Sequence, residues 1–267
     1  MMATTMIHHQ ANRGEEPCTP APWRDLFLTH IASMQPAATL TLATTHPDAT
    51  PRARTCVYRG LWGSLPPNER NPAPRNPEGV FESDLPVITT DARMEKAEEI
   101  GVLGGPVEAV FWAEDHSTQW RLRGDAYLLG RDGGGKEVRG ALAQRTRRLP
   151  GGEEKEWSWS AEVTRHFGNL SPVMRGSFRN PPPGTPLATT TPAEGEGLGQ
   201  TVEDLHDEIA RRNFRVVVIV PNEVDQVDLT DPKRARRWLY TYRGMSYKAT
   251  HPGGEVIGEW EKVEVWP

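Results

Sequence analysis

Short segments in which polar and apolar residues alternate recur along this chain, and they restrict its fold more than any other feature. Residues 39–44 and 54–59 flank a turn with two prolines and an aspartate, and residues 107–112 precede a longer alternating segment at 119–129. Alternation interrupted by turn residues is typical of antiparallel hairpins with one buried face. Further strands are predicted at 85–90, 238–242 and 259–266, and at 215–220 and 224–229 with a turn at Pro221-Asn222 between them.

Segments with helical spacing lie between these strands. Apolar residues from Leu26 to Met34 predict a short amphipathic helix, and Asp91 is predicted to cap a second helix over 92–100. Further helices are predicted at 136–149 and 157–167. Strands in hairpins, with helices inserted among them, predict a mainly β fold with peripheral helices, built as an antiparallel barrel or sandwich.

Glycine and proline mark the segments outside the predicted core, since the chain has 25 Gly and 24 Pro among 267 residues. Residues 1–20 begin with a polar stretch and are predicted to form a disordered N-terminal tail. Residues 21–267 are predicted to form a single domain with loop insertions at about 63–80 and 185–203. The Thr, Pro, Gly and Glu composition of the second insertion predicts disorder from 185 to about 200.

Charge and hydropathy exclude two classes of protein. With 31 Lys and Arg against 36 Asp and Glu, the net charge is -5, so the chain lacks the global positive field on which nonspecific nucleic-acid binding depends. No segment approaches the roughly 20 apolar residues of a membrane-spanning helix, and the mean hydropathy is -0.61. The N-terminal residues lack a signal-peptide core, and Cys18 and Cys56 lack the spacing of metal ligands. We therefore expect a cytoplasmic protein without a metal site.

The clearest local signal for a binding site is electrostatic. Arg93 and Lys96 fall in the first turns of the predicted helix capped by Asp91, where the helix dipole disfavours cations. A bound anion would remove this conflict, and the hydroxyls of Thr89 and Thr90 just before the helix would add donors for a phosphate. The alternative is that both cations pair with acidic neighbours on a solvated helix face, and the spacing alone slightly favours it. These neighbours are Glu95, Glu98 and Glu99.

Two further groups of polar residues lie on predicted strands. Arg54 and Arg59 belong to the second strand, and Gln119 shares one strand face with Arg121 and Arg123. Both groups offer donors to an anionic or a planar polar ligand. For the two arginines, an exposed strand edge is as compatible with the sequence as ligand contact, and for the face of Gln119 a charged solvent-exposed surface is favoured.

Residues 130–137 resemble a nucleotide-binding loop in their spacing. Their glycine and lysine spacing matches a Walker A motif, but Glu137 stands where a Ser or Thr would reach magnesium. The surrounding pattern is not that of parallel strands joined by helices. Nucleotide hydrolysis is therefore not expected, and a flexible turn between a strand and a helix accounts for the glycines.

Six segments, taken in order, carry a resemblance to a known family. They are APWR at 21–24, RTCVYRG at 54–60, ITTDARMEKAEEI at 88–100, QWRLRGD at 119–125, LSPVMRGSF at 170–178 followed by PPPG at 181–184, and RWLY at 237–240. In this order they resemble the pyridoxamine phosphate oxidase-like family of FMN-binding split barrels, in particular its uncharacterised Alr-type members. The resemblance spans nearly the whole chain from residue 21 and implies an antiparallel split β-barrel that binds FMN.

The resemblance also implies a cofactor site shared by two subunits. Family residues that match the arginines and the lysine of the segments at 54–60 and 88–100 surround the flavin phosphate and ribityl chain, and those that match the two threonines hydrogen-bond the cofactor. The match of Gln119 approaches the isoalloxazine or ribityl oxygens, and the match of Arg237 reaches the flavin from the partner subunit, which implies a homodimer. The cofactor-binding residues implied are Arg54, Arg59, Thr89, Thr90, Arg93, Lys96, Gln119 and Arg237.

Departures from the family concern the substrate more than the cofactor. Met94 replaces the Ser or Thr that commonly follows the matched arginine, and Val173, Lys233 and Ala235 stand where the true oxidases hold the substrate phosphate. The resemblance therefore implies a flavin-dependent oxidoreductase that transfers hydride between an unidentified small molecule and FMN, and not a vitamin B6 oxidase. The alternatives are a noncatalytic module that binds flavin, F420 or haem, and an interaction protein that binds no chromophore.

Overall fold

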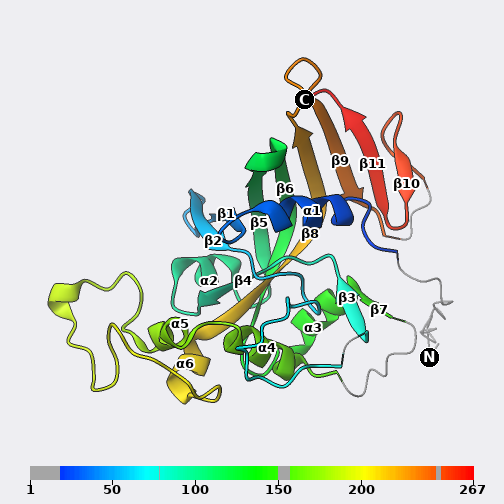
Figure 1. The fold of residues 1–267 in the computed structure, drawn as a ribbon. Coiled ribbons are helices and arrows are strands. Elements are labelled where there is room, and N and C mark those ends of the chain that lie inside the picture. Colours follow the sequence, from blue (N-terminus) through cyan, green and yellow to red (C-terminus); the bar gives the residue numbers. More distant parts are fainter. Residues whose placement is uncertain (1–18, 78, 150–156, 245–247) are drawn as a thin grey trace, which may run out of the picture.

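Nine strands pair side by side in an antiparallel sheet that forms the frame of the molecule (Figure 1). The computed structural model describes residues 19–77, 79–149, 157–244 and 248–267, so most of the predicted N-terminal tail lies outside the described residues. The strands follow the order β10-β11-β9-β8-β6-β5-β1-β2, and β4 pairs with β8 off this path. Their bounds are β1 Thr39–Thr45, β2 Pro51–Val57, β4 Val87–Asp91, β5 Gly105–Ala113, β6 Thr118–Leu129, β8 Phe214–Asp228, β9 Arg236–Tyr242, β10 Glu255–Ile257 and β11 Trp260–Val265.

Most of the helices gather near the start of β8, and α1 crosses the sheet (Figure 1). The helices are α1 Arg24–Ser33, α2 Glu95–Ile100, α3 Lys136–Ala143, α4 Trp159–Gly168, α5 Pro172–Gly176 and α6 Glu208–Asn213. A second sheet of two short strands, β3 (Phe81–Ser83) and β7 (Thr146–Arg148), lies outside the main one. The main sheet is not closed along its described path, so the predicted fold class, a mainly β antiparallel split barrel with peripheral helices, is confirmed.

Strand β8 divides the buried side chains into two clusters. Val217 and Ile219 point into a cluster with Trp23, Phe27 and other aromatic residues, whereas Val216, Val218 and Val220 point into a second cluster. The second cluster contains Trp62, Phe167 and Phe214 and lies beneath the helices that follow β6. Because successive side chains of a strand alternate between its faces, one β-branched run supplies both cores.

The prediction of a hairpin at Pro221-Asn222 is wrong, because 214–228 is one continuous strand. Gly124 of β6 pairs with Pro221 and Arg123 pairs with Glu223, which leaves Asn222 as the extra residue of a β-bulge. A bulge tolerates a proline that cannot donate a ladder hydrogen bond. Gly124 permits the close approach, since a Cβ there would lie 2.0 Å from the carbonyl oxygen of Val220.

The predicted start of α2 is also wrong. Asp91 is the last residue of β4, the helix begins at Glu95, and no side chain caps it. Instead of capping a helix, the carboxylate of Asp91 accepts hydrogen bonds from the backbone N–H of Arg93 (2.8 Å) and from its guanidinium. The argument from the helix dipole therefore does not apply to Arg93, which lies before the helix.

The two predicted loop insertions take defined positions. Residues of the first pack on α4, where the side-chain amide of Asn71 donates to the carbonyl of Arg165 (2.9 Å) and that of Asn76 donates to Glu162 (2.9 Å). The second, at 185–200, follows an exposed path with one short turn of 3-10 helix at Leu187–Thr189. The predicted helix at 136–149 ends at Ala143, because 146–148 pairs with β3 instead.

Candidate functional site

A cavity of about 770 Å³ opens between β2, β4, α2 and the segment from Leu170 to Leu198. Its volume lies within the range of small-molecule sites. Four of the predicted cofactor residues line it: Arg59, Thr89, Thr90 and Lys96. The structure thus brings together residues of β2, β4 and α2 that lie far apart in the sequence.

Lys96 lies in the wall of this cavity without an acidic partner. Its ammonium group donates to the hydroxyl of Thr90 (3.3 Å) and contacts the sulfur of Met94 (2.9 Å), and it forms no ion pair with a described residue. Burial lowers the pKa of Lys96. The carboxylates of Glu99 and Asp91 act on this ammonium group without forming an ion pair with it, so the partly buried cation is free to contact an anion.

Arg59 presents the same situation at the end of β2. Its Nε is buried and has no hydrogen-bond partner among the described residues, and no ion pair to its guanidinium is present there either. Burial lowers the pKa of Arg59. The backbone N–H of Arg59 donates to the carbonyl of Val87 (2.8 Å), so pairing with β4 fixes the position from which this side chain extends.

Arg54 and Arg93 differ from these two cations because each forms an ion pair with a carboxylate. The guanidinium of Arg54 donates to Glu99 (2.8 Å) and to the hydroxyl of Thr44, and the residue lies beside the cavity wall, one position before Thr55. Arg93 pairs with Asp91 (2.7 Å) and also donates to the carbonyl of Asn180 (2.9 Å). Arg93 therefore ties the Pro-rich wall to the end of β4, whereas Arg54 adds positive charge that is already compensated.

Gln119 and Arg237 lie at the other end of β8. Thr90 pairs with Arg215, whereas Gln119 pairs with Val227, which is also the partner of Arg237. Twelve residues of an extended strand separate the two positions, about 40 Å at about 3.3 Å per residue. Within one chain, Gln119 and Arg237 therefore do not share the cavity of Lys96.

Sequence reasoning missed the far wall of the cavity. It comes from Met174, Ser177 and Phe178 of α5 and the turn after it, and from 181–185 with Leu187, Thr190, Pro192, Gly197 and Leu198 of the second insertion. Cys56, whose thiol pKa is raised by burial, lines the side of β2. The PPPG run at 181–184 is a signal that could have located this wall, because Pro- and Gly-rich turns form loops and binding residues are often on loops.

A family model matches the first half of the described fold. The model for the FMN-binding domain of pyridoxamine 5'-phosphate oxidase matches residues 20–130, from before α1 to the end of β6. Over these residues, about two fifths of the chain, the protein is similar to the pyridoxamine 5'-phosphate oxidase family. The match includes seven of the eight predicted cofactor residues and ends before the helices that close the cavity.

Two individual proteins are also similar to this chain. An uncharacterized protein of Saccharomyces cerevisiae is 26% identical over 109 residues, which are 41% of this chain and 34% of the relative, so the match spans about a third of the yeast protein. A pyridoxamine 5'-phosphate oxidase-related, FMN-binding protein from Nostoc punctiforme has a solved structure that superposes with a TM-score of 0.61 at 22% identity. That alignment covers 93% of this chain and 100% of the other, and it shows that the two share a fold.

Within the described residues, no helix is long and apolar enough to cross a membrane, and no group of three or more His, Cys, Asp or Glu is arranged to hold a metal ion.

Proposed function

We propose that the cavity binds FMN and that the protein is a flavin-dependent oxidoreductase acting on a small molecule. The observation that carries the proposal is the pair of partly buried cations, Arg59 and Lys96, that lack carboxylate partners within the described chain and lie with Thr89 and Thr90 in one cavity. Cations and hydroxyls in a partly buried wall are the donor set that a phosphate monoester requires. The residues present therefore fit the phosphate of FMN.

Each part of the cavity has a separate task in this proposal. Arg59 and Lys96 neutralise and orient the phosphate, and Thr90, held by Lys96, donates a hydroxyl beside it. The apolar wall from Leu170, Met174 and Phe178 excludes water from the ring system. When bound, FMN supplies hydride or electron transfer, and the protein supplies its position and its electrostatic environment.

We further propose that the site is completed by a second copy of the chain. The separation of Gln119 and Arg237 from the cavity supports this, because they reach a flavin only if another subunit presents them. Trp112, directly opposite Gln119 across β5 and β6, is 45% exposed, and Val57 on the edge strand β2 is 36% exposed. Exposed apolar side chains on the same sheet are typical of an interface between copies.

The first experiment is the absorption spectrum of the purified protein before and after FMN is added and the excess removed, with the released chromophore identified by chromatography. We expect stoichiometric FMN in the wild type and none in the double variant Arg59→Gln/Lys96→Met. The control is Lys136→Met, which removes an exposed lysine from the start of α3. A colourless wild type that takes up no FMN contradicts the cofactor assignment, and chromatographic identification of F420 or haem replaces it.

Catalysis is tested separately from binding. Anaerobic reduction of the bound flavin by a candidate small molecule, followed by reoxidation with repeated turnover, supports the oxidoreductase. The second candidate is a noncatalytic flavin module. It is favoured by Val173, which is 59% exposed and does not line the cavity, so that α5 offers no cation from this position to a substrate phosphate. Flavin that binds stoichiometrically but is reduced by no substrate in a broad screen supports this second function.

Mixing two damaged chains tests the shared site. In a homodimer with shared sites, chains carrying Lys96→Met and chains carrying Arg237→Gln form mixed dimers in which one of the two sites has both residues intact. Random assortment then restores roughly a quarter of the wild-type flavin content. If each variant alone loses flavin and the mixture regains none, the two residues do not form a common site across an interface.

A further inference from the structure

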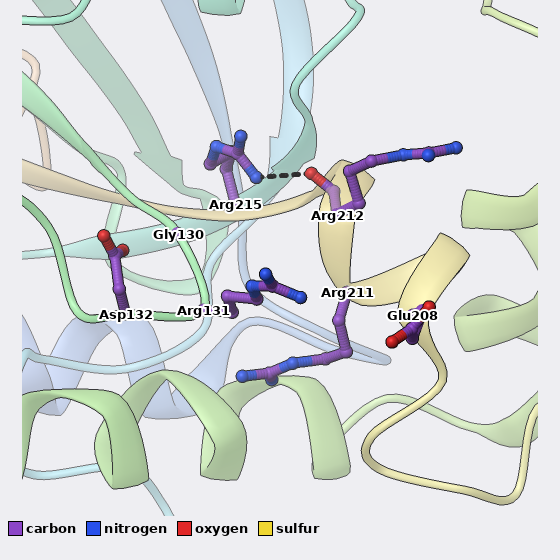
Figure 2. Close-up of a pocket in the computed structure, with 7 residues that line it drawn as sticks. All are labelled: Gly130, Arg131, Asp132, Glu208, Arg211, Arg212 and Arg215. Atoms are coloured by element: carbon purple, nitrogen blue, oxygen red, sulfur yellow. Dashed lines mark hydrogen bonds between the residues drawn. The ribbon is translucent and has the colours of Figure 1, made fainter.

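A second cavity, of about 560 Å³, lies on the side of β8 where the turn after β6 meets α6 (Figure 2). It shares no lining residue with the cavity proposed for FMN. Four arginines and two acidic residues line it: Arg131, Arg211, Arg212 and Arg215 with Asp132 and Glu208. The formal charge of this lining is therefore positive, although the whole chain is negative.

The charges of this cavity are poorly compensated within the protein. None of its arginines forms an ion pair with a described residue. Figure 2 shows Arg131 and Arg211 side by side in the middle of the cavity, with Asp132 at one side and Glu208 at the other. Arg212 directs its guanidinium away from the other arginines, and its carbonyl oxygen accepts a hydrogen bond from Arg215 (2.8 Å).

Arg211 is the strongest indication that this cavity binds an anion. The residue is 5% exposed, and its Nη2 donates to the hydroxyl of Thr164 (2.9 Å), but its Nη1 is buried without a described partner. Burial and the nearby charge of Arg131 lower the pKa of Arg211 to about 10. Burial also lowers the pKa of Arg215. Buried guanidinium groups are normally paired, because an unpaired buried charge is costly.

We propose that this cavity binds a compact anion with two or more phosphate groups. Arginine guanidinium groups present several donors in a planar fork that matches phosphate oxygens. The volume exceeds what a single inorganic phosphate fills and lies in the range of small organic ligands. No aromatic or aliphatic side chain is among the described lining residues, so the cavity suits a phosphorylated compound without a large apolar ring.

Part of this site belongs to the segment whose spacing resembles a Walker A loop. Arg131 and Asp132, which line the cavity, belong to residues 130–137, but the lysine of that segment does not line it. Hydrolysis of a nucleotide is not part of the proposal, which assigns binding only. Because the cavity belongs to one chain and is separate from the FMN site, it does not depend on the proposed function.

Titration calorimetry of the purified full-length protein with inorganic pyrophosphate at low ionic strength tests the proposal. We expect saturable binding to the wild type, binding about tenfold weaker in Arg131→Gln, and an unchanged affinity in the control Arg234→Gln. Arg131 and Arg234 are both exposed, and Arg234 lies in the turn between β8 and β9. Arg211→Gln is expected to weaken binding at least as much, and Arg131→Gln keeps the test valid if this buried variant does not fold.

Three results overturn the proposal: a wild type that does not bind pyrophosphate, equal weakening in Arg131→Gln and Arg234→Gln, and equal affinity for sulfate and pyrophosphate at matched ionic strength. Flavin content is measured in the same samples. Displacement of FMN by pyrophosphate would place the anion in the flavin site instead. If the protein proves colourless, saturable pyrophosphate binding that depends on Arg131 still supports the second cavity.

Discussion

Cations lie near both ends of β8. Those that line the cavity at the end near Thr90, the unpaired end, have no carboxylate partner in the described chain, whereas those on the strands at the end near Gln119, the paired end, form ion pairs. At the end near Thr90, Arg59 and Lys96 line a cavity without carboxylate partners among the described residues. At the end near Gln119, Arg237 forms two hydrogen bonds with Asp225 (2.9 and 2.8 Å), and Arg121 pairs with Glu108 (2.6 Å) and with Asp225 (3.4 Å). The first two cations are unpaired within the described chain, as the proposed phosphate site requires, whereas carboxylates of the sheet compensate Arg237 and Arg121.

Arg237 is positioned for the proposed shared site by its pairing with Asp225. Its guanidinium is already oriented by Asp225, which is 3% exposed, and side-chain hydrogen bonding to Asp225 raises the pKa of Arg237. An arginine held in this way offers its remaining donors at a fixed position, which is a favourable arrangement for contact with a planar ligand of a second subunit. Lys96, in contrast, has its charge available for a ligand of its own chain.

The largest expected effect comes from removing the carboxylate of the paired end. Asp225→Ala leaves Arg121 without one partner and Arg237 without both of its hydrogen bonds to Asp225. We expect the free energy of unfolding to fall by about 3 kcal/mol, because removing one member of a buried charged network leaves the others unsatisfied. Urea unfolding of the flavin-free protein measures it. Glu223→Ala, which removes the more exposed partner of Arg123, is the control and should cost far less; equal losses contradict the comparison.

Removing a cation from the unpaired end should not lower the free energy of unfolding. Lys96→Met removes a partly buried cation that forms no described ion pair, so we expect the free energy of unfolding without flavin to stay the same or to rise. The dissociation constant for FMN should rise about thirtyfold, about 2 kcal/mol, because a charge-assisted hydrogen bond to phosphate is lost. Flavin fluorescence quenching measures the affinity. A variant that is destabilised but binds FMN normally would show that Lys96 is a structural residue.

Sequence patterns predicted the frame of the fold because alternation and turn residues act locally. The hairpins β1–β2 and β5–β6, the helix α1 and the final strands all lie where the patterns placed them. The exceptions depend on distant partners. The Pro221-Asn222 dipeptide becomes a bulge because β6 and β9 flank β8 there, and 146–148 leaves the helical pattern because Arg147 pairs with Asp84 across the small sheet.

The candidate site was predictable in part for the same reason. Thr89, Thr90 and Lys96 lie close together in sequence, so their association followed from local spacing, although the capping argument that joined them to Arg93 was wrong. Whether each cation has an acidic partner was not predictable. Arg54 pairs with Glu99, which is distant in sequence, and Arg59 has no acidic partner in the described chain. The far wall was missed because composition alone predicts disorder for 185–200 and cannot place it beside β4.

A buried histidine behind the unpaired end makes stability depend on pH. His166 is fully buried, and burial, with the charges of Arg165 and Arg59, lowers its pKa to about 3. In the unfolded chain its pKa is about 6.5, so below pH 6.5 the unfolded state binds a proton that the folded state does not. Stability is therefore lost as pH falls from about 6.5 towards 3, by about 1.4 kcal/mol per pH unit.

The variant His166→Phe isolates this contribution. Neither ring nitrogen of His166 has a hydrogen-bond partner in the described chain, so the substitution removes the titration without breaking a bond. Glu162, 4.0 Å from the ring, has a pKa raised by burial and contributes in the opposite direction, but it is present in both proteins. We expect the difference in unfolding free energy between variant and wild type to grow as pH falls from 6.5 to 4.5 in urea titrations. Parallel pH profiles would mean that His166 titrates normally in the folded state.

The smallest effect on the free energy of unfolding is expected for an exposed arginine at the paired end. Arg123 lies on the same strand face as Arg121 but is 52% exposed, and its ion pairs with Glu108 (3.4 Å) and Glu223 (2.8 Å) face solvent. Exposed pairs contribute little because water and salt screen them. Arg123→Gln should therefore lower the free energy of unfolding by no more than about 0.5 kcal/mol, an effect that disappears in 1 M salt. Arg121→Gln, closer to the buried carboxylate of Asp225, should cost more and retain most of its effect in salt. If both substitutions have equal effects at both salt concentrations, burial of the carboxylate does not decide which arginines stabilise the sheet.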